Sequence, residues 1–146
     1  MKIDWTTDSA GMMLGFSYHD SKLIGLELFE SRYLRLTLST PQGLVKLELN
    51  DLDTVTLEEI WNVPIVSDIF AWPVGAAPAR VWDTSDGPWY VLLSGRAHNA
   101  EQVKAGAARI IKRRPEAFLV QILNSYGGTI SAVCEKISVS TEGPAT

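Results

Sequence analysis

The sequence predicts an α+β domain with a largely antiparallel sheet of about six to eight strands and one main helix near residues 100–114. Apolar and polar residues alternate through much of the first half of the chain, which gives each strand one apolar face. Short turn-forming segments separate these runs, and connections that short allow only antiparallel neighbours. A single amphipathic segment in the second half predicts the helix.

The first half of the chain predicts a meander of four strands. The first covers residues 12–19, and apolar residues then occupy alternate positions in 24–29, 34–39 and 45–49. The segments between these runs are polar or contain Pro and Gly, as turns do. We expect one face of the meander to form the core, with Ile24, Leu26, Leu36, Leu38, Leu47 and Leu49 among its residues.

The region from 51 to 87 is interrupted by prolines, which occur in sheets only at edges, bulges and loops. Residues 55–61 fit either a further strand or a helical turn. Shorter strands are predicted at 65–72, at 80–82 and, just before the helix, at 89–93. The sheet is therefore expected to continue through this region in short pieces.

The main helix is predicted to begin after Asn99, because Asn is a favourable N-cap and Gln102 completes a capping-box pattern. Its apolar stripe includes Val103 and Ile110, and we expect this stripe to cover part of the alternating-leucine face. Basic residues in the last turns complement the helix dipole, and Pro115 ends the helix.

A hairpin formed by residues 118–123 and 129–139 is predicted to complete a single domain that spans residues 1–140. Residues 141–146 are small or polar and are expected to form a flexible tail. A pure β-sandwich with a peripheral helix is the competing architecture.

Composition excludes several classes of protein. The chain has 146 residues, a formal net charge of −4 and a single cysteine, Cys134. One cysteine excludes an intramolecular disulfide and a cysteine-based metal cage, and Cys134 is expected to be a core or half-buried strand residue. The negative charge argues against nucleic-acid binding, and no stretch approaches the ~20 apolar residues of a membrane span. We therefore expect a soluble, cytoplasmic monomer or weak dimer with no metal and no cofactor.

Two histidines are candidates for acid–base chemistry. A carboxylate beside an imidazole fixes its tautomer and raises its pKa, so His19 and Asp20 form the first candidate. Neighbouring residues on a strand point to opposite faces, so these side chains meet only if the chain turns there. His98, just before the helix, is the second candidate. Asp and His are also common loop residues, so no catalytic residue is assigned, and a small enzyme that uses His19 and Asp20, or His98, is an alternative function.

Tryptophans and acidic residues alternate in the middle of the chain. Aromatic side chains are enriched at interface hot spots and also suit sugar rings, whereas buried tryptophans would simply fill the core. A Gly-Pro turn within this segment favours partial exposure. A carbohydrate or small-ligand binder that uses the tryptophan cluster is a second alternative function. The predicted partner-binding residues are Trp82, Asp83, Asp86 and Trp89, with Glu58 and Glu59 as the next acidic patch.

The chain resembles bacterial immunity proteins in its small size, its acidic charge, its α+β architecture and its lack of a catalytic constellation. Such proteins bind and block a cognate toxin, often a basic nuclease. The segment Tyr18–Gly25, followed by two alternating strands, also resembles the opening of small uncharacterised bacterial domains, a likeness that covers about a third of the chain and implies no activity. The first resemblance implies a non-enzymatic protein-binding module whose acidic face meets a basic toxin domain.

Overall fold

The computed structural model of the chain describes residues 1–60, 64–77, 87–93 and 99–142. Its largest element is a seven-stranded sheet in which all neighbouring strands are antiparallel, and this confirms the predicted α+β class with a largely antiparallel sheet. The strands of this sheet are β1 (Lys2–Ile3), β4 (Ser21–Phe29), β5 (Tyr33–Thr40), β6 (Gly43–Glu58), β7 (Ile65–Pro73), β8 (Phe118–Asn124) and β9 (Thr129–Thr141).

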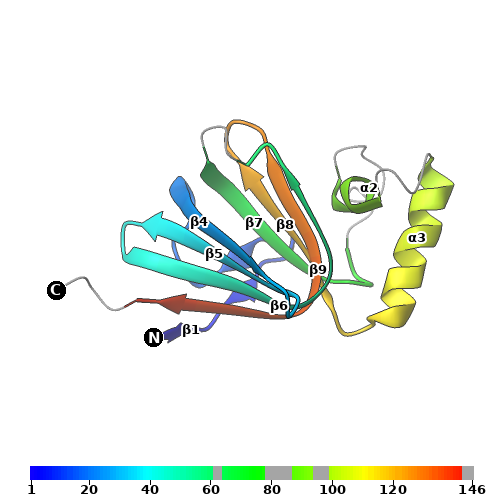
Figure 1. The fold of residues 1–146 in the computed structure, drawn as a ribbon, viewed down its shortest axis with the longest axis horizontal. Helices are drawn as coiled ribbons and strands as arrows, with labels where there is room; N and C mark the ends of the chain where they lie inside the picture. The colour runs from blue at the N-terminus through cyan, green and yellow to red at the C-terminus, as the bar shows by residue number, and fades with distance from the viewer. Residues whose placement is uncertain (61–63, 78–86, 94–98, 143–146) are drawn as a thin grey trace.

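Six of these strands form a closed ring (Figure 1). The order within the sheet is β1-β9-β6-β5-β4-β7-β8, and β8 also pairs with β9, so the six strands from β9 to β8 close on themselves and β1 extends the sheet beside β9. The seam between β4 and β7 is short, because only Ser21 with Val66 and Lys22 with Ile65 are paired. The two long strands, β6 and β9, pair with each other along most of their length.

The interior of the ring confirms most of the core predicted from alternation. Leu36 and Leu38 of β5 and Leu47 and Leu49 of β6 are buried, with at most 1% of each residue exposed. Directly paired residues of an antiparallel sheet point to the same face, and the pairing of β5 with β6 places these leucines together inside the ring. The apolar faces of the strands therefore pack against one another inside the ring, and a helix is not needed to cover them.

The prediction for Ile24 is wrong, because this residue is 52% exposed. The register of β4 against β5 shifts between Leu23 and Gly25, so the alternation of inward and outward side chains is interrupted at Ile24. Leu23 takes the buried position instead, and Leu26 is half-buried.

Two helices, α2 (Pro88–Leu93) and α3 (Ala100–Arg113), lie together on one side of the ring (Figure 1). They pack with the outward-facing side chains of Trp72, Leu119 and Val133, which form a second core outside the ring. The prediction that the main helix covers the alternating leucines is therefore wrong, because the closed ring already encloses them. The predicted start is confirmed: Asn99 Oδ1 accepts a hydrogen bond of 2.9 Å from the backbone N–H of Gln102.

The prediction of a strand at 89–93 is also wrong, since these residues belong to α2. A short apolar run does not distinguish a strand from a buried helix, and here the helical form covers the sheet. Residues 12–19 contribute only the short β3 (Met13–Leu14), which pairs with β2 (Thr6–Thr7) in a separate two-stranded sheet. The meander therefore contains three strands, β4 to β6.

Most of the remaining predicted elements are present, with small changes in their bounds. The strand at 65–72 and the final hairpin are present, and β6 continues through Glu58. Thr141, predicted to lie in the tail, is the last residue of β9, and the N–H of Glu142 donates to the Leu44 carbonyl. The predicted strand at 80–82 lies outside the described residues. None of the helices described here is both long and apolar enough to cross a membrane.

Candidate functional site

Some of the predicted site residues lie outside the described residues, and the structure places the others. Trp82, Asp83 and Asp86 lie outside the described residues, as does His98. Trp89 is fully buried between the helices and the ring, so we correct the prediction that it contacts a partner.

Trp72 is the other tryptophan of the middle of the chain that the structure describes. It is 5% exposed, and its indole N–H donates to the Ala10 carbonyl at 2.9 Å. Its ring stacks on Phe70 with a centroid distance of 5.2 Å. Neither Trp72 nor Trp89 therefore offers an open ring face on which a sugar could stack.

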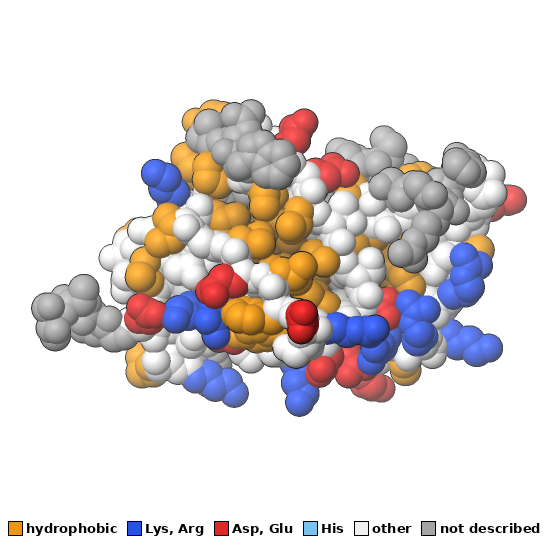
Figure 2. All heavy atoms as spheres, viewed as in Figure 1, with side chains coloured by type: hydrophobic (Ala, Val, Ile, Leu, Met, Phe, Trp, Pro, Cys, Tyr) orange, Lys and Arg blue, Asp and Glu red, His pale blue; other side chains and the backbone are white. Residues whose placement is uncertain are grey.

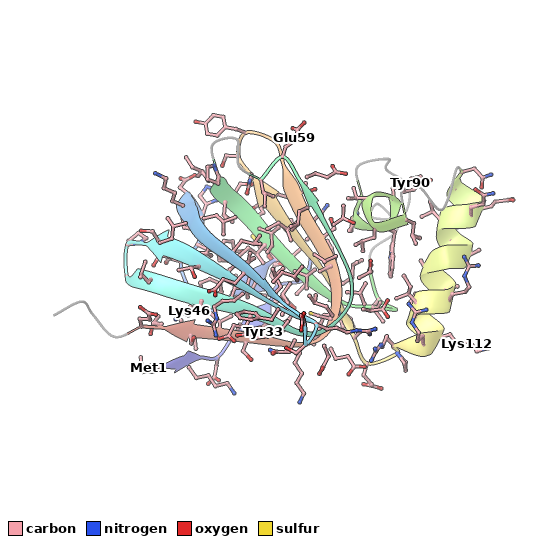
Figure 3. The ribbon with its side chains drawn as sticks, viewed as in Figure 1. Met1, Tyr33, Lys46, Glu59, Tyr90 and Lys112 are labelled. Atoms are coloured by element: carbon pink, nitrogen blue, oxygen red, sulfur yellow. The ribbon has the colours of Figure 1, made fainter. Side chains whose placement is uncertain are left out.

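Glu58 and Glu59 are exposed at one end of the ring, where β6 ends (Figure 3). Glu59 has a left-handed backbone with φ of 50°, so the chain turns sharply at this residue. A Cβ atom added at Gly128 would lie 2.7 Å from the Glu59 carbonyl oxygen and 3.0 Å from that of Glu58. The β8–β9 turn therefore packs backbone against backbone on this corner, and only glycine fits there.

The same turn presents Tyr126, whose side chain is among the most exposed large apolar ones, at 66%. Two hydrogen bonds fix the turn: Asn124 N–H donates to the Gly128 carbonyl at 3.1 Å, and Ser125 N–H donates to the Ile65 carbonyl at 2.8 Å. The end of β6, the β8–β9 turn and the start of β7 thus meet at one place. We call the residues Glu58, Glu59 and Tyr126 the acidic tip.

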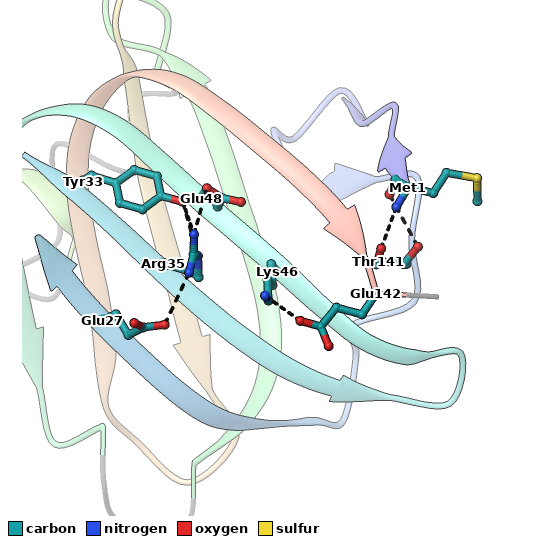
Figure 4. A network of polar contacts seen from close by, with 8 residues as sticks. All are labelled: Met1, Glu27, Tyr33, Arg35, Lys46, Glu48, Thr141 and Glu142. Atoms are coloured by element: carbon teal, nitrogen blue, oxygen red, sulfur yellow. Dashed lines mark hydrogen bonds and ion pairs between the residues drawn. The ribbon is translucent and has the colours of Figure 1, made fainter. Parts of the chain in front are cut away.

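Within the described parts of the chain, the carboxylates of Glu58 and Glu59 have no ion-pair partner. Acidic groups on the β4–β6 face differ, as Figure 4 shows, because Arg35 lies 3.6 Å from Glu27 and 4.0 Å from Glu48. Those carboxylates are held by a cation of the same sheet, whereas the acidic tip keeps its charge available to another molecule.

Charge is also distributed unevenly among the described elements, and Figure 2 shows one face of the molecule with its charged side chains coloured. Outside α3 and Arg114, the described residues include fourteen Asp and Glu but only six Lys and Arg. The segment of α3 with Arg114 carries five basic residues and one acidic residue, and Lys and Arg side chains gather over it in the view. The described part of the chain outside α3 and Arg114 is therefore acidic.

Part of the basic charge of α3 is used to hold the helix on the ring. Arg113 binds Asp53 through two nitrogens, with distances of 3.0 Å and 2.7 Å, and Arg114 lies 3.1 Å from Glu135. The Asp53 side chain is only 6% exposed. Burial raises the pKa of Asp53, but the Arg113 and Arg114 guanidinium groups outweigh it, so that this pKa lies below its usual value.

A pocket of about 450 Å³ lies beside β7 and is lined by residues 12–19 together with Ser67 and Asp68. The Tyr18 hydroxyl is buried in this segment and donates to the Met13 carbonyl at 2.7 Å. Burial is the main reason that the pKa of Tyr18 is raised. The Ala71 N–H donates to the Gly11 carbonyl at 2.9 Å, so the segment that lines the pocket is hydrogen-bonded to β7 itself.

His19 lines this pocket, and the side chain of Asp20, the next residue, comes close to it because Asp20 has a left-handed backbone with φ of 62°. His19 Nε2 is 3.7 Å from Asp20 Oδ2, and His19 Nδ1 is 2.7 Å from the Ser67 carbonyl oxygen. The hydrogen bond to Ser67, followed by the charge of Asp20, raises the pKa of His19. Both side chains are more than 70% exposed, so the pair is surrounded by solvent and is not enclosed in a site that excludes water.

Cys134 is fully buried in β9, as predicted. Burial, with a smaller effect from Asp51, raises the pKa of its thiol to about 12, so the thiolate needed for nucleophilic attack is scarce at neutral pH. Across the described ranges, no three His, Cys, Asp or Glu side chains are arranged so that they could hold a metal ion.

Sequence reasoning missed Tyr126 and Asp68 as surface groups. Tyr126 had a usable signal, because it precedes two glycines between apolar strands, where a hairpin turn exposes its residues. Asp68 had none, since its neighbours in the pocket come from residues 12–19. Comparison of the chain with protein-family models, with curated proteins and with solved structures finds no match.

Proposed function

We propose that this protein is a non-enzymatic protein-binding module that acts in the cytoplasm and neutralises a basic partner, as an immunity protein neutralises its cognate toxin. The observation that carries the proposal is the acidic tip, in which the turn with an exposed tyrosine packs on the backbone of two glutamates whose carboxylates no described cation neutralises. Tyrosine is enriched among residues that dominate binding energy, because it buries a large area with few rotatable bonds.

The backbone of the acidic tip supports this role. Gly128 packs on the carbonyls of Glu58 and Glu59, and Ser125 is hydrogen-bonded to Ile65, so the tip is held in place before any partner arrives. A surface ordered in advance loses less conformational entropy on binding. The net negative charge of the described residues outside α3 and Arg114 attracts a basic partner and raises its rate of association.

The test begins with capture of the partner from the native host by the tagged full-length protein, and with identification of the neighbouring coding sequence. Surface plasmon resonance then compares the parent with Tyr126→Ala. We expect dissociation to be at least about 30-fold faster if Tyr126 is a hot spot worth about 2 kcal/mol.

The matched control is Glu101→Gln, an exposed acidic residue on α3, far from the tip, and it should bind as the parent does. Circular dichroism must show that each variant is folded. Folded Tyr126→Ala that dissociates at the parental rate would contradict the proposed site. Trp82, Asp83 and Asp86 stay predictions, and the same kinetic comparison of their alanine variants tests them.

A small enzyme is the second candidate function, because His19 lines a pocket and its Nε2 lies 3.7 Å from Asp20 Oδ2. An imidazole with a raised pKa beside a carboxylate can transfer protons. Turnover in a broad hydrolase screen that is lost in His19→Ala, while partner binding is retained, would favour this function over the first.

A further inference from the structure

The pocket beside β7 combines an apolar wall with one acidic group. Phe16 is half-buried, and its ring centroid lies 5.1 Å from that of the buried Tyr18. Met12 and the buried Met13 also line it, and Asp68 is the acidic residue of the lining. Among the described residues no lysine or arginine lines the pocket, and His19 is the basic side chain in its lining, where the charge of Asp68 contributes to its raised pKa.

We infer that this pocket receives the side chain of one arginine or lysine of the partner, an inference that rests on the proposed function. Arginine and lysine side chains have an aliphatic stem and a charged end, which match the apolar wall and the Asp68 carboxylate respectively. Aromatic faces such as that of Phe16 also attract cations. Asp68 supplies the opposite charge, and it has no ion-pair partner within the described parts of the chain.

The pocket is formed without a partner. The Tyr18 hydroxyl donates a hydrogen bond to the Met13 carbonyl. This bond holds the aromatic ring in place, and the hydroxyl therefore needs no hydrogen bond from a ligand. Gly11 lies against Trp72 so closely that a Cβ atom there would be 2.1 Å from the indole nitrogen, which fixes the start of the segment. A pre-formed pocket of about 450 Å³ is within the usual range for binding small organic groups.

The pocket and the acidic tip are linked through β7. Ile65, the first residue of β7, accepts the hydrogen bond from the β8–β9 turn that carries Tyr126. Asp68 lies three residues further along this strand, which corresponds to about 10 Å. A partner of ordinary interface size that covers the tip can therefore reach the pocket with one long side chain.

The experiment uses small probes and needs no partner. Isotope-labelled full-length protein is titrated with N-acetyl-arginine amide and with N-acetyl-lysine amide, and amide signals are followed by NMR. N-acetyl-citrulline amide, which has nearly the shape of the arginine probe without its charge, is the matched neutral probe. We expect saturable shifts of the signals of Gly15, Ser67 and Asp68, with dissociation constants on the order of 1–10 mM.

Two variants locate the effect. Asp68→Asn keeps the shape of the side chain and should weaken binding of the arginine probe at least fivefold. Phe16→Leu keeps the wall apolar but removes the ring, and should weaken it about twofold to fivefold. Glu101→Gln should bind the probe as the parent does.

Absence of saturable shifts, equal shifts with the citrulline probe, or unchanged affinity of folded Asp68→Asn would each overturn the inference. The outcome is separable from that of the proposed function. If the arginine probe binds but Tyr126→Ala binds the partner as the parent does, the inference about the pocket is supported and the proposed role of the tip is contradicted. If the probe does not bind but Tyr126→Ala dissociates faster from the partner, the role of the tip is supported and the inference about the pocket is contradicted.

Discussion

His19 Nδ1 lies 2.7 Å from the carbonyl oxygen of Ser67, which fixes the imidazole against β7. A carbonyl only accepts hydrogen bonds, so Nδ1 carries the proton, and Nε2 faces Asp20 at 3.7 Å. The protonated ring is favoured by both contacts, and the pKa of His19 is therefore raised above 6.5.

An NMR titration of the His19 ring should give a pKa above 6.5, and Asp20→Asn should lower it without returning it fully to that value, since the Ser67 hydrogen bond remains. A pKa raised by folding stabilises the protein below 6.5, and this contribution is lost as the pH rises through the folded-state pKa. A ring that titrates at or below 6.5 in the parent would contradict the contact geometry.

Gly128→Ala should destabilise the protein more than Gly127→Ala. Both glycines have positive φ, of 90° and 88°, but only at Gly128 would the new Cβ meet a backbone oxygen, at 2.7 Å. We expect a loss of about 1 kcal/mol in the free energy of unfolding for Gly127→Ala, and about 2–3 kcal/mol for Gly128→Ala. Urea unfolding measures both, and equal losses would mean that the turn does not pack on the corner at Glu59.

Leu36→Ala should lower the free energy of unfolding by about 2–5 kcal/mol, because Leu36 is 1% exposed inside the ring. Ile24→Ala should cost less than about 1 kcal/mol, because the register shift in β4 leaves Ile24 half exposed. Chemical denaturation of the pair tests the orientation of β4. A loss at Ile24 as large as that at Leu36 would show that the register shift is absent.

Asp53→Asn should destabilise the attachment of α3 by about 1 kcal/mol at neutral pH, because it removes the paired contact with Arg113. The pKa of Asp53 is lowered in the folded state, so its contribution is present above 3.8 and is lost as the pH falls through the folded-state pKa. The difference between variant and parent should therefore shrink in acid.

The matched control is Asp51→Asn, since Asp51 is exposed and forms no ion pair with the described residues. Thermal unfolding at several pH values measures both variants. A difference between Asp53→Asn and the parent that persists unchanged in acid would show that the Arg113 contact does not carry the effect.

Local pattern was enough to predict the strands around Leu36 and Leu47 and the start of α3 at Asn99, because alternation and capping are properties of neighbouring residues. The predicted hairpin supplies the pairing of β8 with β9, but closure of the ring also depends on the pairing of β6 with β9, of β7 with β8 and of β4 with β7, which join segments far apart in the chain and which neighbouring residues do not encode. The position of α3 followed from that closure and was predicted on the wrong apolar surface.

The candidate site was only partly accessible from the sequence. Glu58 and Glu59 were predicted as an acidic patch, and they are exposed at the end of β6. Trp89 looked like an anchor because of its acidic neighbours, but an apolar helix of six residues places it in the core. The pocket needs residues 12–19 to lie on Ser67 and Asp68, a long-range contact without a local signal.

The most direct test of the central claim is the salt dependence of the association rate with the captured partner, measured for the parent and for the double variant Glu58→Gln, Glu59→Gln. Unpaired carboxylates at the tip should accelerate the approach of a basic partner, and screening by salt should remove this advantage. We expect the double variant to associate more slowly at low ionic strength and with a weaker dependence on salt, while Glu101→Gln behaves as the parent. An unchanged rate and an unchanged salt dependence in the folded double variant would contradict the account.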